Sequence, residues 1–129
     1  MAFVLEIESL TAGYGDLPVV HEFSARIERG TVTTLIGGNG AGKSTLLRAV
    51  YGTCRHFSGS IRFEGQAVQA LPPWERLARG IGFVPQGRCN FASMSVWENL
   101  KMACYTLPAA RHAQAIDRVV ELFPALRPR

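Results

Sequence analysis

The sequence predicts an α/β fold with an N-terminal antiparallel β region, a glycine-rich loop between a strand and a helix, and a helical region after them. Apolar and polar residues alternate from Phe3 to Ile7, the period of a strand with one buried face. The β-branched run from Thr31 to Ile36 enters the glycine-rich loop, and a helical pattern starts at Lys43. Beyond Gln86 the apolar residues recur at helical spacing, which predicts the last region.

The composition is that of one folded domain. The chain has 129 residues, of which 47% are hydrophobic and 19% are charged, so it can bury a core. No apolar run approaches the roughly 20 residues of a membrane-spanning helix, and the first six residues lack the pattern of a signal peptide. We therefore expect the chain in the cytoplasm, where it can still dock on a membrane protein.

Charge, cysteine and histidine patterns exclude several kinds of site. The formal net charge is +4, but lysine and arginine are scattered along the chain, so no nucleic-acid-binding face is indicated. The three cysteines show no Cys-x-x-Cys spacing, which argues against a disulfide framework and against a zinc site. The three histidines are isolated, whereas metal sites need clustered ligands.

Strand patterns recur along the first two thirds of the chain. Besides the strand at Phe3 to Ile7, we expect strands at residues 19–28, 31–36, 58–65 and 81–84. Turn residues fill positions 11–16, between the first two strands. Pro85 ends the last strand, and the glycine and polar residues at 87–90 predict a loop.

Four helices are expected from apolar stripes and end signals. The first runs from Lys43 to about Tyr51 and stops at a glycine. A short one spans residues 72–80, with proline at its start and glycine at its end. Ser95 and Glu98 form a capping box that opens a third, whose stripe runs from Val96 to Cys104. The fourth carries apolar residues from 116 to 123 and ends at Pro124.

The glycine-rich loop matches the phosphate-loop pattern Gly-x-x-x-x-Gly-Lys-Ser in full. Glycines allow backbone conformations closed to other residues, so successive N–H groups can converge on one anion. The following helix directs its free N–H groups and its positive dipole end at the same point. The flanking strand and helix favour this interpretation over a glycine turn that binds nothing. The predicted phosphate-binding residues are Gly37, Gly38, Asn39, Gly40, Ala41, Gly42, Lys43, Ser44 and Thr45.

Two side chains of the loop predict the ligand. Lys43 should reach the β and γ phosphates of a nucleoside triphosphate as a point charge. The Ser44 hydroxyl should coordinate Mg²⁺. The expected cofactors are therefore ATP and Mg²⁺, and the fold class is that of the P-loop nucleoside triphosphatases.

With these residues identified, the chain resembles the ATP-binding subunit of an ABC transporter from residue 2 to its last residue. In that family an aromatic residue ahead of the phosphate loop stacks on adenine, and Tyr14 in Gly13-Tyr14-Gly15 stands at that place. The family's glutamine loop contacts Mg²⁺ and the attacking water, and Phe83-Val84-Pro85-Gln86-Gly87 matches it. The resemblance thus implies that Lys43 and Gln86 are catalytic and that Ser44 and Gln86 bind the metal.

Within the family, the sequence motifs resemble those of the importers of branched-chain amino acids. The segments that carry this likeness are Leu71-Pro72-Pro73, residues 79–88 and Val96-Trp97-Glu98-Asn99-Leu100. Urea importer ATPases share most of these motifs and are the alternative. Trp97 and Cys89-Asn90 depart from the usual pattern, which leaves the substrate class less specific than the family. The transported solute does not touch this subunit in such systems.

Several motifs of a complete ABC ATPase are absent from these residues. They are the Leu-Ser-Gly-Gly-Gln signature, the apolar strand ending in Asp-Glu and the switch histidine. Glu121-Leu122-Phe123-Pro124 resembles the family's sequence shortly before the signature. We therefore interpret the chain as truncated before that motif. The resemblance then implies the N-terminal part of one ABC nucleotide-binding domain, with residues 1–87 as β subdomain and phosphate-loop core and 88–129 as the start of a helical subdomain.

The resemblance also implies partners. Two ATP-binding subunits sandwich two ATP molecules, and transmembrane permease subunits contact the segment Arg88 to Tyr105. The chain is then peripheral on the inner face of the plasma membrane.

Three other hypotheses about its function remain: a soluble ABC-type ATPase of DNA repair or translation, a small phosphoryl-transfer kinase, and a fragment that binds nucleotide without turnover. We favour the last for the isolated 129 residues. Unpaired strand edges and exposed apolar surface are expected in it, and they predict that it aggregates.

Overall fold

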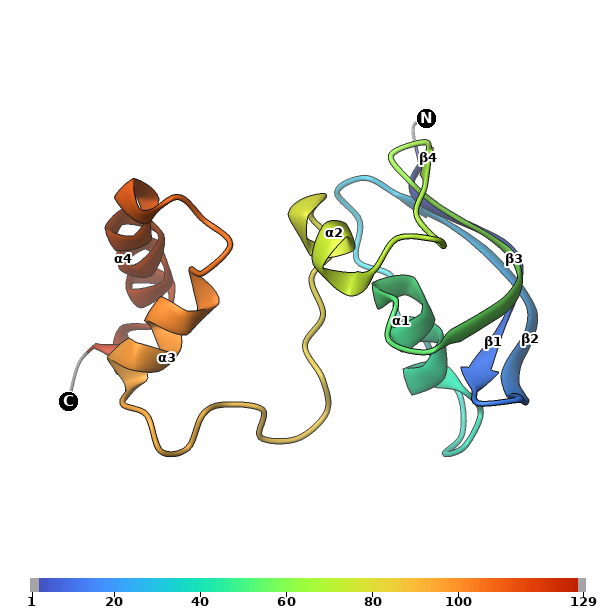
Figure 1. The fold of residues 1–129 in the computed structure, drawn as a ribbon, viewed down its shortest axis with the longest axis horizontal. Helices are drawn as coiled ribbons and strands as arrows, with labels where there is room; N and C mark the ends of the chain where they lie inside the picture. Colours follow the sequence, from blue (N-terminus) through green and yellow to red (C-terminus); the bar gives the residue numbers. More distant parts are fainter. Residues whose placement is uncertain (1–2, 128–129) are drawn as a thin grey trace. The chain divides into compact units, whose positions relative to one another are not determined.

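The computed structural model describes residues 3–127 (Figure 1). The chain separates into two compact units, one extending to Val84 and one beginning at Pro85, and each is described by itself. The first unit contains a sheet and two helices, and the second unit is helical. None of the described helices is long and apolar enough to cross a lipid bilayer.

The sheet of the first unit is antiparallel throughout. It contains β1 (Phe3–Tyr14), β2 (Leu17–Glu28), β3 (Arg55–Phe63) and β4 (Gln66–Ala67), in the order β2-β1-β3-β4. The strand β1 is paired on both sides, so Ile7 lies opposite Ala25 of β2 and opposite Ile61 of β3. The sheet confirms the predicted antiparallel β region. The predicted turn at 11–16 is wrong in its extent, because β1 continues through Tyr14 and only Gly15 and Asp16 form the turn.

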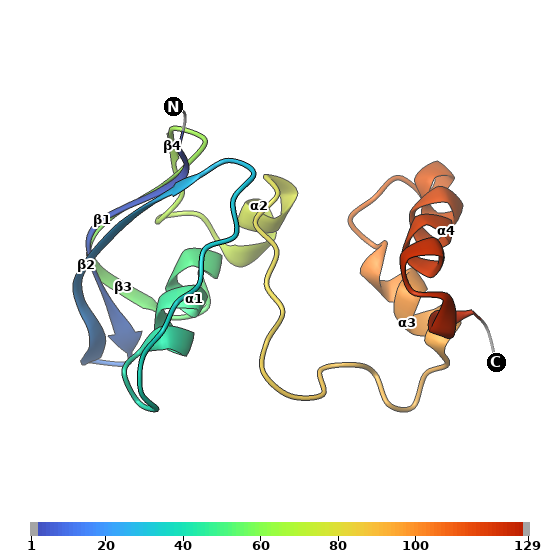
Figure 2. The same ribbon diagram turned by 180° about the vertical axis from the view of Figure 1, so that it is seen from behind.

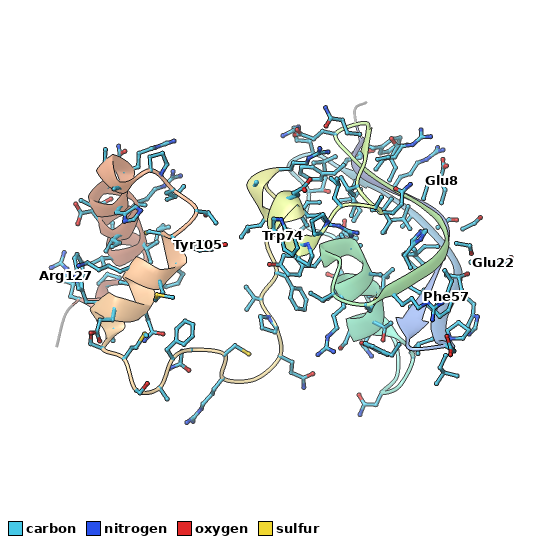
Figure 3. All side chains as sticks on the ribbon, viewed as in Figure 1. Glu8, Glu22, Phe57, Trp74, Tyr105 and Arg127 are labelled. Carbon is cyan, nitrogen blue, oxygen red and sulfur yellow. The ribbon has the colours of Figure 1, made fainter. Side chains whose placement is uncertain are left out.

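Helix α1 (Lys43–Tyr51), whose predicted bounds are confirmed, packs on one face of this sheet. Helix α2 (Pro73–Ala78) lies on the same side next to α1, as both ribbon views show (Figures 1 and 2). Glu22 extends from the sheet on the side away from α1 (Figure 3). The core between sheet and helices consists of small and medium apolar side chains: Ile7, Leu10, Ala12, Val20, Leu46, Ala49, Ile61, Val68 and Ile81.

Two predicted strands do not form. Residues 31–36 and 81–84 have no strand pairing in the described part of the chain, although both were expected to be strands. A strand needs a neighbour for its N–H and C=O groups, and the four paired strands leave none beside these segments. Val32 and Ile36 of the first segment are accordingly exposed, at 96% and 88% accessibility, and Val84 of the second is 93% accessible, whereas Ile81 is buried in the core. The predicted exposed apolar surface is therefore confirmed.

The second unit is built on α3 (Val96–Ala103) and α4 (His112–Leu122), with short 3-10 turns at Ala109–Arg111 and Pro124–Leu126. The predicted capping box is confirmed. The Glu98 backbone N–H donates to Ser95 Oγ at 3.2 Å, and the Ser95 N–H donates to Glu98 Oε2 at 2.7 Å. Among residues 85–127, the buried apolar side chains are those of Cys104 and Ile116. Of the predicted stripe, Val96 and Ala103 are exposed and only Cys104 is buried.

Candidate nucleotide-binding site

The predicted phosphate loop leads into the first turn of α1, and its residues 37–41 are exposed. Gly40 and Gly42 have φ angles of +81° and +92°, in the left-handed region that favours glycine. Gly42 is also the N-cap residue of α1, and a Cβ at this position would lie 3.4 Å from Val20 Cγ2. The two glycines therefore set the path by which the backbone turns into the helix. Within the loop, the Ala41 N–H donates to Gly38 O at 3.3 Å.

Lys43 lies against the backbone of the same loop. Its ammonium group donates to the carbonyl oxygens of Gly37 and Gly38, at 2.6 Å each. These bonds hold a positive charge beside the loop amides before any anion arrives. A polyphosphate would replace neutral carbonyl acceptors with charged oxygens, and charge-assisted hydrogen bonds are about twice as strong as neutral ones.

The start of α1 has the features of an anion site. Among the described residues no side chain caps its first turn, and its first turn contains no acidic residue. The first N–H groups of a helix lack partners within the helix, and the dipole adds partial positive charge there. Ser44 is exposed at this end, so its hydroxyl is accessible to a metal bound by the phosphates. The donor set of amides, ammonium and hydroxyl thus fits phosphate.

Tyr14 lies beside the first two turns of α1, although it is distant from them in sequence. Its hydroxyl oxygen accepts from Thr45 Oγ1 and from Arg48 Nη1, at 3.4 Å each. Thr45 itself is buried, whereas Tyr14 remains 41% accessible. The partly open aromatic ring next to the phosphate loop is the arrangement that stacking on a base requires. The sequence analysis did not predict that Arg48 lies at this site. Only its position three residues after Thr45, on the same face of the helix, could have indicated this.

Gln86 is exposed and falls at the start of the second unit. Its carbonyl oxygen accepts a weak hydrogen bond from Cys89 Sγ at 3.7 Å. Its predicted contacts with Mg²⁺ and water stay predictions. The described residues contain no group of three or more His, Cys, Asp or Glu side chains that could hold a metal. A metal at this site would therefore depend on phosphate oxygens and Ser44 for much of its coordination.

The segment predicted to contact partners, residues 88–105, is mostly exposed and is ordered by local hydrogen bonds. Asn99 donates from Nδ2 to the carbonyl oxygens of Phe91 and Ser95, at 3.0 and 2.9 Å. Lys101 Nζ lies 5.8 Å from the centre of the Trp97 ring. Tyr105 projects from the end of α3 and is 72% accessible (Figure 3). The unit thus presents aromatic residues on a preformed surface.

Comparison with known proteins decides the family. A profile of the ABC transporter family matches residues 20–127, which is most of the chain. The chain belongs to this family. Its resemblance to ABC ATP-binding subunits, inferred from the motifs, is therefore confirmed. The fold is the N-terminal portion of the ABC-type ATPase domain, with the antiparallel sheet and the first helices.

Relatives of this ABC chain include transport ATP-binding proteins. The high-affinity branched-chain amino acid transport ATP-binding protein BraG of Pseudomonas aeruginosa is 38% identical over 98% of this chain and 54% of its own length. A probable branched-chain amino acid transport ATP-binding protein of Archaeoglobus fulgidus, LivF, is 37% identical over 96% of this chain and 52% of its own length. The chain spans about half the length of these relatives.

Solved ABC structures agree with the fold. The structure of cbiO1 from Clostridium perfringens, described as part of the ABC transporter complex cbiONQ, superimposes with a TM-score of 0.75. Sequence identity is 28%, and the match covers 94% of this chain and 50% of cbiO1. The similarity extends over both units of the ABC chain, since it includes nearly all of its residues.

Proposed function

We propose that this chain binds ATP with Mg²⁺ and forms the nucleotide-binding part of the ATP-binding subunit of an ABC importer. The observation that carries the proposal is the loop before α1, where Lys43 Nζ lies 2.6 Å from two loop carbonyls at an uncapped helix start. Family membership supports ATP as the nucleotide. In this proposal residues 1–87 supply the nucleotide site and residues 88–129 the surface for partners.

Each predicted site residue has a role in this proposal. The backbone N–H groups from Gly37 to Thr45 bind phosphate oxygens, and Lys43 neutralises charge on the β and γ phosphates. Ser44 and Gln86 hold Mg²⁺, which, when bound, neutralises charge on the γ phosphate during its transfer. Tyr14 stacks on adenine, and Gln86 orients water.

The proposed transport substrate is a branched-chain amino acid, with urea or a related amide as the alternative. The names of the relatives from P. aeruginosa and A. fulgidus support the first. The solute does not contact this subunit in the proposal, so the test needs the whole transporter. Uptake of labelled leucine, isoleucine or valine should be lost when the gene is deleted and restored by the complete subunit. Loss of urea uptake alone would favour the alternative.

The proposed partners are transmembrane permease subunits and a second ATP-binding subunit, which place the chain on the inner face of the plasma membrane. The exposed aromatic residues between Arg88 and Tyr105 support a permease contact there, because aromatic residues are enriched at interface centres. A photo-crosslinker at Trp97 should label a permease subunit, whereas one at Glu22, on the outer side of the sheet, should not. Equal labelling from both positions would contradict this contact.

By itself the 129-residue chain is proposed to bind nucleotide without turnover. Hydrolysis in this family depends on an Asp-Glu pair after an apolar strand, a signature from a partner and a switch histidine, and these motifs are not among its residues. Phosphoryl transfer relies on such positioning and charge. Stoichiometric binding of ATP with no release of phosphate is the expected result.

The decisive experiment compares Lys43→Ala with Arg62→Ala. Both variants remove one positive charge, but Arg62 is an exposed residue of β3 outside the loop. Losing a charge-assisted hydrogen bond costs ~1.5–3 kcal/mol, so Lys43→Ala should weaken ATP binding by roughly 10- to 100-fold in calorimetric titration. Arg62→Ala should bind like the parent chain. Unchanged affinity in Lys43→Ala would refute the assignment.

A further inference from the structure

One arginine of the first unit is buried without a carboxylate partner. Arg76 on α2 is only 3% accessible. No ion pair to Arg76 is present among residues 3–127. Its guanidinium instead donates to four backbone carbonyls. Nη1 donates to Ala49 O at 2.7 Å and Val50 O at 2.8 Å, Nε to Leu71 O at 2.9 Å, and Nη2 to Gln69 O at 2.9 Å.

Two of these acceptors lie in the last turn of α1. The final carbonyls of a helix have no partner within the helix and carry its partial negative charge. Arg76 satisfies the carbonyls of Ala49 and Val50 and places a cation at the negative end of the dipole. Burial lowers the pKa of the guanidinium, with Cys54 acting in the opposite direction, but arginine stays protonated in proteins.

The guanidinium packs closely against Gly52. Gly52, which ends α1 with a φ of +94°, would bring a Cβ to 2.8 Å from Arg76 Cζ. A larger residue at this position would require the guanidinium to shift, and the positive φ also favours glycine. The end of α1, the segment 69–71 and α2 are thus joined through one side chain.

The other end of α1 carries the phosphate loop. The helix has nine residues, so at 1.5 Å per residue its two ends are about 13 Å apart. A tilt of so short a helix would move the N–H groups at its start relative to the loop that precedes it. Leu46 and Ala49 hold one side of the helix on the sheet, and Arg76 fixes its carbonyl end.

We propose that Arg76 is a positioning residue for nucleotide binding: it holds the carbonyl end of α1 and thereby keeps the N–H groups at the other end directed at the phosphates. This rests on the proposed function, because the ligand is the polyphosphate of that proposal. An arginine with a purely structural role would contribute to folding alone. The two roles differ in what happens to affinity in a variant that is still folded.

The test uses the full chain and ATP with Mg²⁺, titrated at a temperature at which circular dichroism shows each variant folded. Arg76→Met removes the donors and the charge while keeping an unbranched side chain. It should weaken binding about tenfold, because the carbonyl end of α1 is no longer held and the N–H groups at its start are no longer kept in place. Arg76→Lys retains the charge but not the planar fork, so its affinity should lie between those of Arg76→Met and the parent chain. If Arg76→Met fails to fold, the affinity of Arg76→Lys decides between the two roles.

Ile7→Ala is the matched control, since it removes buried contacts from β1 without touching the carbonyls of α1. It should lower stability but leave the affinity of the folded chain unchanged. Parent-like affinity in folded Arg76→Met, or an equal loss in Ile7→Ala, overturns the proposal. If the parent chain itself binds no ATP, the proposed function fails and this inference falls with it. Parent binding with parent-like affinity in Arg76→Met overturns the inference alone.

Discussion

The strand β1 and the segment 31–36 are similar in sequence and different in structure. Both are runs of apolar and β-branched residues. β1 lies between β2 and β3, and its residues Ile7, Leu10 and Ala12 are buried. Residues 31–36 have no strand neighbour, and their apolar side chains face solvent. β-propensity is thus a preference for a packed sheet surface and produces no strand where the partner is missing.

The exposed segment also borders the candidate site. Leu35 and Ile36, together with Phe23 and Leu46, line an apolar hollow of about 180 Å³ next to the phosphate loop. Exposed apolar runs with unpaired backbone groups are the usual origin of edge-to-edge association. The aggregation expected from the sequence stays a prediction, and a monomeric, cooperative melting transition would contradict it.

Amide hydrogen exchange gives the largest expected difference between the two regions. Most amides of β1 are paired with β2 or β3, so they should exchange mainly through global unfolding. For a stability of ~5 kcal/mol this slows exchange by about 10³-fold or more. Amides of residues 31–36 should exchange almost freely. Mass spectrometry of the chain at short labelling times measures both, and equal protection would show that 31–36 is paired in solution.

A pair of alanine variants tests the same contrast through stability. Ile7→Ala removes a buried side chain from β1 and should lower the free energy of unfolding by ~2–5 kcal/mol. Val32→Ala removes a side chain that is already exposed, so its effect should stay within about 0.5 kcal/mol. Urea denaturation followed by circular dichroism gives both values. A large loss in Val32→Ala would mean that residues 31–36 are packed.

The smallest effect is expected in α3, where local side chains satisfy the helix end. Hydrogen bonds from the Ser95 backbone and then from its hydroxyl lower the pKa of Glu98 below its usual value. A lowered pKa in the folded state adds stability above the unfolded pKa of about 4.3, and this stability is lost as pH falls through the folded value.

Glu98→Gln removes the titrating carboxylate from this box. The variant should lose part of the acid sensitivity of helical circular dichroism between about pH 5 and pH 2, a range that includes the usual glutamate pKa. Glu121→Gln, which removes an exposed carboxylate from α4, serves as the control. If Glu98→Gln and the parent chain lose helicity along the same pH curve, the capping box does not contribute.

Local elements were predictable because their information is local. The helix α1 has its phosphate loop and its terminal glycine within a few residues, and its predicted bounds match the structure. The capping box of α3 depends on side chains three residues apart. The predicted phosphate-binding residues are contiguous, so they lie together whatever the rest of the chain does.

Contacts between distant residues could not be predicted in this way. Tyr14 and Arg48 meet although they are 34 positions apart, and Arg76 reaches carbonyls 26 and 27 positions before it. An arginine on a short helix is usually exposed, so nothing in the local pattern indicates that Arg76 is buried. The missing strands at 31–36 and 81–84 have the same cause, since strand pairing depends on partners elsewhere.

The sequence alone determined the phosphate loop and the helix after it, because glycines, a lysine and a hydroxyl at fixed spacing meet a backbone requirement that is local. It also contains the motifs by which the chain resembles the ABC family. Tertiary structure decided which apolar runs became strands, and it decided that Arg76 holds the end of α1. Both outcomes depend on backbone N–H and C=O groups finding partners, and where those partners lie is settled only when the chain packs.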